Sequence, residues 1–126
     1  MTSIELVGWF SDLPHGRPDG PRLADSVGAT AADDAAVVAD YLEDGTVIAE
    51  TTGAVLRDAL DAGQPQIGPF RTLSDGRYVW PSDFPYYVRK YSVAVPASLL
   101  TAARGGPPRG LTDDEIDAVV DALLGD

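Results

Sequence analysis

Residues 75–91 read DGRYVWPSDFPYYVRKY and predict a β-hairpin that leads directly into a helix. Asp75-Gly76 lies between two β-rich runs, 67–73 and 77–80, and both residue types tolerate positive φ in a tight turn. The run WPSD at 80–83 ends the second strand and supplies polar caps for the helix. In that helix the apolar side chains recur at helical spacing, which predicts a buried stripe made of Phe84, Tyr87, Val88 and Tyr91.

Upstream of the hairpin, the pattern predicts strands over 4–10 and 46–51. Between them lies a loop over 11–29 that is rich in Pro and Gly and longer than compact domains usually tolerate. A helix follows this loop, with Thr30 as its N-cap and Gly45 as the left-handed residue that ends it. The segment 53–63 predicts a short amphipathic helix, because its apolar side chains are spaced for one face.

Downstream, Pro96 to Arg104 predicts a helix that ends at Gly105, and 105–110 is a Gly/Pro linker. The last helix, over 112–124, has the strongest local signals, because Thr112 and Glu115 form a capping box. The whole pattern predicts one globular domain over residues 1–126. Its predicted class is α+β: a small, largely antiparallel sheet of about four strands, with helices packed on one face and an amphipathic C-terminal helix.

The hairpin and its helix resemble a segment of small actinobacterial proteins, in which a D-G-x-x-x-W-P-x-D hairpin exit leads into an aromatic helix. In this chain the resemblance covers 75–91 and Val95-Pro96. It implies no activity and transfers no site residue. The composition agrees with such a source, because eight Arg against one Lys and the absence of Asn indicate a GC-rich genome.

Charge is unevenly distributed along the chain, whose formal net charge is −11. Residues 1–63 carry a net −9, residues 64–111 a net +4, and residues 112–126 a net −6. The middle segment also contains seven of the ten aromatic residues. One interpretation is internal neutralisation, in which the middle segment packs against the acidic ends. The other is a binding face of aromatic and Arg side chains, which are enriched at protein interfaces.

Several chemistries are disfavoured by what the sequence lacks. The absence of Cys excludes disulfides, Cys-ligated zinc and thiol catalysis. No phosphate-binding loop, dinucleotide fingerprint, nucleophile elbow or zinc-protease motif occurs. The single histidine, His15, lies among loop aspartates without the fixed spacing of a metal motif. The sequence therefore favours a non-enzymatic protein with no cofactor and no metal.

The leading functional prediction is an acidic binding protein, such as an inhibitor or immunity-type partner of a basic toxin, because acidic surfaces steer basic partners. Two faces qualify: the aromatic face near Tyr86, and the acidic loop 12–34 with the helix 113–124. The candidate binding residues are Trp80, Tyr86, Arg89, Lys90, Asp113, Asp114 and Asp117.

Two alternatives stay open. The first is a small enzyme or ligand-binding domain with a pocket under loop 11–28, lined by Asp12, His15 and Asp19. The second is a regulatory or assembly subunit that forms a homodimer through a sheet edge or the last helix.

The same composition limits the partners and the location. A net charge of −11 repels nucleic-acid phosphates, so the expected partner is a protein, with nucleic acid disfavoured. No apolar run approaches the roughly 18 residues of a membrane span, and the first residues lack the pattern of a secretory signal. We therefore expect no membrane association and a cytoplasmic location.

Overall fold

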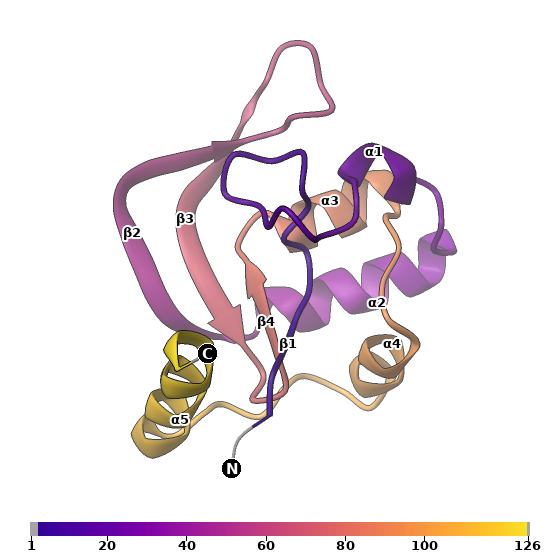
Figure 1. Ribbon diagram of the computed structural model, residues 1–126. Helices are drawn as coiled ribbons and strands as arrows, with labels where there is room; N and C mark the ends of the chain where they lie inside the picture. Colours follow the sequence, from indigo (N-terminus) through magenta and orange to yellow (C-terminus); the bar gives the residue numbers. More distant parts are fainter. Residues whose placement is uncertain (1–2, 126) are drawn as a thin grey trace.

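The computed structural model describes residues 3–125. Its strands and helices are labelled in chain order in Figure 1. They are β1 (Glu5–Leu6), α1 (Leu23–Ser26), α2 (Ala32–Glu43), β2 (Thr46–Arg57), β3 (Gln66–Ser74), β4 (Tyr78–Pro81), α3 (Phe84–Tyr91), α4 (Ala97–Arg104) and α5 (Asp113–Leu124).

The four strands form one sheet in the order β1-β4-β3-β2. β2 pairs with β3 and β3 with β4 in antiparallel fashion, whereas the short β1 runs parallel to β4. Helix α2 packs against both α3 and α4. The fold is therefore the α+β class with a largely antiparallel four-stranded sheet, as the sequence predicts.

The hairpin between β3 and β4 is confirmed, and Asp75 organises its turn. One carboxylate oxygen accepts hydrogen bonds from the backbone N–H groups of Arg77 and Tyr78, at 2.9 and 2.8 Å. The other accepts from the Tyr41 hydroxyl at 2.7 Å, which ties the turn to α2. Gly76 has φ +98°, a conformation that side chains with a Cβ rarely adopt. Burial and the neighbouring Asp75 raise the pKa of Tyr41 well above its usual value.

The stripe on α3 forms the centre of the core, also as predicted. Phe84, Tyr87 and Val88 are fully buried, and Tyr91 is partly buried. They join Trp80 of β4, which is completely enclosed and is the largest side chain of the core. The hairpin-to-helix segment thus supplies most of the large apolar side chains on which α2 packs.

The segment predicted as a helix over 53–63 is a strand and a turn instead, so that prediction is wrong. β2 continues to Arg57, where Val55 and Leu56 pair with Pro69 and Gly68 of β3. The chain then turns through 58–65, closed by a hydrogen bond from the Asp58 N–H to the Pro65 carbonyl at 3.0 Å. Pairing with β3 therefore overrides the local helical spacing.

The boundaries of α2 also differ from the prediction. Ala31 occupies the N-cap position, and the Thr30 hydroxyl donates instead to the carbonyl of Val93 at 2.9 Å. Gly45 is not in the left-handed region. Its lack of a side chain serves close packing, because a Cβ at this position would overlap the ring of Trp80.

The N-terminal segment forms a shorter strand than the sequence predicts, and the loop after it contains a helix that the sequence does not predict. The predicted strand over 4–10 reduces to Glu5–Leu6, and Gly8, two residues later, adopts φ +82°, which is incompatible with an extended strand. The predicted loop 11–29 contains the short helix α1, whose first N–H, that of Leu23, donates to the Asp12 carboxylate at 2.8 Å. Asp12 therefore has a structural role in the loop.

The C-terminal helix is confirmed with its capping box. The N–H of Glu115 donates to the Thr112 hydroxyl at 3.2 Å, and the N–H of Thr112 donates to the Glu115 carboxylate at 3.0 Å. α5 lies apart from the other helices, near the start of β2 and the end of β3 (Figure 1). A hydrogen bond from the Leu111 N–H to the Thr46 hydroxyl, at 3.1 Å, holds it there. Within residues 3–125, no helix is both long and apolar enough to cross a membrane.

Candidate functional site

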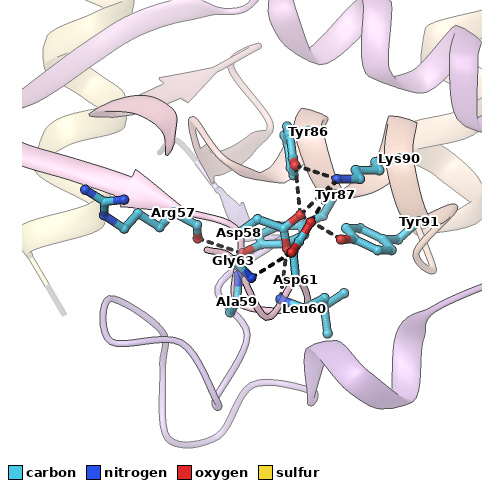
Figure 2. A network of polar contacts seen from close by, with 10 residues as sticks. All are labelled: Arg57, Asp58, Ala59, Leu60, Asp61, Gly63, Tyr86, Tyr87, Lys90 and Tyr91. Carbon is cyan, nitrogen blue, oxygen red and sulfur yellow. Dashed lines mark hydrogen bonds and ion pairs between the residues drawn. The ribbon is translucent and has the colours of Figure 1, made fainter. Parts of the chain in front are cut away.

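The most densely bonded buried polar group is Asp58, at the end of β2. Its side chain is fully buried. The hydroxyls of Tyr86 and Tyr91 donate to Oδ2 at 2.8 and 2.7 Å, and the N–H of Leu60 donates to Oδ1 at 2.8 Å. Lys90 adds its ammonium at 3.4 Å. Figure 2 shows these α3 side chains converging on the carboxylate.

These donors decide the charge state of Asp58. Burial alone would raise the pKa of this carboxyl group. The hydrogen bonds from Tyr91, Tyr86, the Leu60 N–H and Lys90 outweigh burial and hold the pKa below its ordinary value. Asp58 is therefore an ionised carboxylate at neutral pH, and both of its oxygens accept hydrogen bonds from the protein. A buried carboxylate bonded in this way fastens the fold rather than taking part in acid–base chemistry.

Tyr87 completes the link between α3 and the turn. Its hydroxyl donates to the Arg57 carbonyl at 3.1 Å and accepts from the Ala59 N–H at 3.0 Å. Burial raises the pKa of Tyr87 to about 12, helped by the charges of Asp83 and Asp58 and opposed by the Ala59 hydrogen bond. Tyr87 is therefore a neutral phenol that satisfies backbone groups which the turn leaves without partners.

A second buried polar pair joins the N-terminal loop to α3. Nε2 of His15 lies 2.8 Å from Oδ2 of Asp83, away from the line of a hydrogen bond. The Asp83 side chain is fully buried and that of His15 is 11% exposed. Asp83 occupies the N-cap position of α3 but makes no capping bond. The His15 ring packs 5.1 Å from the ring of Phe70.

The three residues predicted to share a pocket under loop 11–28 do not come together. The loop instead separates two cavities. Asp19 lines one of about 490 Å³, beside Trp9 and Phe84, and forms an ion pair with Arg17. His15 lines another of about 450 Å³, between the loop and the end of β2. Asp12 lines neither, because its carboxylate holds the start of α1.

The predicted aromatic face is largely occupied by contacts within the protein. Trp80 is completely buried and cannot touch a partner. The Tyr86 hydroxyl is bound to Asp58. Arg89 bonds to Asp40 and Glu43, at 2.7 and 2.9 Å.

All six basic side chains of residues 64–111 form ion pairs within the chain, with N–O separations of 2.5 to 3.8 Å. Each pair joins the basic middle segment to an acidic end, which is the internal neutralisation predicted as one of the two interpretations. The pairs are Arg71 with Glu50, Arg77 with Glu5, Arg89 with Asp40 and Glu43, Lys90 with Asp58 and Asp61, Arg104 with Asp34, and Arg109 with Glu115.

The aspartates of helix α5, unlike the basic side chains of the middle segment, are not ion-paired within residues 3–125. Asp113, Asp114, Asp117 and Asp121 are exposed, and none has a cationic partner within residues 3–125. The acidic loop 12–34 lies at the other end of the molecule (Figure 1), so the two predicted acidic segments do not form one face.

In the part of the chain that the structure describes, no group of three or more His, Asp or Glu side chains is arranged to hold a metal ion. Comparison with known proteins found no matching family model, no matching curated protein and no matching solved structure.

Proposed function

We propose that the chain is a non-enzymatic binding protein whose acidic helix α5 engages a basic protein, in the manner of an inhibitor or immunity-type partner of a basic toxin. The observation that carries the proposal is the difference in charge pairing across the surface. The cations of the middle segment are neutralised by internal ion pairs, whereas Asp113, Asp114, Asp117 and Asp121 of α5 are exposed to solvent without a cationic partner within residues 3–125.

The spacing on α5 supports this role. Asp113, Asp117 and Asp121 follow one another at i, i+4 and i+8, so they form one stripe along the helix. Like charges at this spacing repel and slightly destabilise a helix. Cations from a partner would relieve that repulsion and would also be attracted over long range.

The test compares two triple variants that remove the same charge. Asp113→Asn/Asp117→Asn/Asp121→Asn neutralises the stripe. Asp25→Asn/Asp33→Asn/Asp44→Asn neutralises three exposed aspartates elsewhere that also lack a cationic partner within residues 3–125. Binding to the purified product of the adjacent gene is measured by calorimetry at low and at moderate salt.

The stripe variant should bind at least about tenfold more weakly and show a smaller salt dependence, because close charge pairs across an interface are each worth a kcal/mol or more. The control variant should retain most of the affinity. Equal losses in both variants would mean that only net charge matters. No binding of the unaltered chain at low salt would remove the proposal.

A further inference from the structure

The cavity beside His15 has the size and lining of a small-molecule site. Its volume of about 450 Å³ lies within the range of typical ligand pockets, roughly 300–1,000 Å³. Leu13, Val55, Leu56 and Phe70 supply much of its apolar wall. Its lining residues come from the N-terminal loop and from the end of the β2–β3 hairpin that the turn 58–65 closes. That end of the hairpin lies away from α5 (Figure 1).

The polar groups at this cavity differ in what they can still bind. The carboxylate of Asp58 is already occupied by Tyr86, Tyr91, Leu60 and Lys90. Its side chain is also fully buried, so a ligand in the cavity would not reach it. Nε2 of His15 faces the buried Asp83.

Arg57, by contrast, still has hydrogen-bond donors available to a ligand. Of the nine basic side chains, seven form ion pairs with carboxylates within residues 3–125, and only Arg22 and Arg57 do not. Arg57 lines the cavity, and its single hydrogen bond is from Nη1 to the Gln64 carbonyl at 3.1 Å. The remaining guanidinium N–H groups have the planar arrangement that matches a carboxylate.

We propose that this cavity binds a small organic carboxylate with a flat apolar body. Arg57 holds the carboxylate, and the body lies against Phe70 and the aliphatic wall. The site is independent of the basic partner of α5. In a chain of net charge −11, the global field repels an anion and attracts a cation. A preference for the anion therefore has to come from the cavity itself.

The test uses benzoate, with benzamide and benzamidine as neutral and cationic probes of the same shape, in titrations followed by amide NMR. Benzoate should produce saturating shifts confined to residues 13–15, 54–59 and 70, and should bind more tightly than either analogue. Equal or tighter binding of benzamidine, or shifts spread over the surface, would overturn the proposal.

Matched variants identify the side chain that binds the carboxylate of benzoate. Arg57→Gln should weaken benzoate binding by about tenfold, the usual effect of losing a charged hydrogen-bond partner. Arg57→Lys keeps the positive charge but lacks the planar guanidinium group. Its affinity for benzoate should lie between those of the unaltered chain and Arg57→Gln. Arg22→Gln removes the other unpaired guanidinium, outside the cavity, and should leave the affinity unchanged. Equal affinity of Arg57→Gln and the unaltered chain would refute the assignment, as would a loss in Arg22→Gln. The α5 stripe variant should bind benzoate normally, which separates this test from that of the protein partner.

Discussion

The hydroxyl of Tyr91 donates a hydrogen bond to Oδ2 of Asp58 over 2.7 Å, although 33 positions separate the two residues. Tyr86 and Lys90 of α3 bind the same carboxylate oxygen, and the Tyr87 hydroxyl donates to the backbone carbonyl of Arg57 next to it. The turn after β2 is therefore held in place by a helix that follows it in sequence. The stability of the hairpin end and of α3 should depend on this one carboxylate.

Replacing Asp58 by Ala should lower the free energy of unfolding by about 3 kcal/mol, because it leaves buried donors without an acceptor. Urea denaturation followed by circular dichroism measures the loss. Asp61→Ala is the control, since Asp61 belongs to the same turn but its side chain is 42% exposed. A similar loss in both variants would contradict the central role of Asp58.

The stability should also depend on pH through Asp58. Its pKa is lowered in the folded state from the ordinary 3.8, so the folded state favours the ionised form. The resulting stabilisation is fully present above the ordinary pKa and is lost as the pH falls through the lower, folded-state value. Urea midpoints measured between about pH 6 and pH 3 should fall more steeply for the unaltered chain than for Asp58→Asn. Parallel curves would assign the acid sensitivity to other carboxylates.

The pair of His15 and Asp83 should behave as a coupled unit. His15→Leu leaves the fully buried side chain of Asp83 without its polar neighbour and should cost roughly 1–3 kcal/mol, the usual penalty for a buried polar group without a partner. Adding Asp83→Asn to His15→Leu should cost much less than Asp83→Asn alone, because the contact between the two side chains is already lost in His15→Leu. A double-mutant cycle by urea denaturation measures the coupling. Additive losses would show that the two side chains do not interact.

Gly45 should not tolerate a methyl group. Gly45→Ala places a Cβ against the Trp80 ring and should lower stability by about 2 kcal/mol, a typical cost of overpacking. Gly110→Ala is the matched control, because a Cβ there meets no atom within 4 Å. Thermal unfolding of the two variants compares them directly, and equal melting temperatures would show that the Trp80 ring can move aside.

The sequence predicted the features that are encoded locally. Asp75-Gly76 specifies its own turn, and Thr112 caps its own helix, so both were found from neighbouring residues alone. The segment 53–63 was assigned wrongly, because its apolar spacing also fits the strand that β3 selects. The role of Asp58 could not be recognised from neighbouring residues, because its donors on α3 lie up to 33 positions away. The helix predicted over 53–63 also gave no indication that the side chain of Asp58 is buried.

The strand order has a consequence for how the protein is made. β1 pairs with β4, and the indole N–H of Trp9 donates to the carbonyl of Val79, 70 positions further along. A nascent chain leaves the ribosome from its N-terminus, so the first strand waits unpaired until most of the polypeptide has been synthesised. Closing so long a loop is slow, because its entropy is lost before the contacts form. Folding should therefore finish late in translation, and chains truncated before β4 should expose the first strand to aggregation and proteolysis.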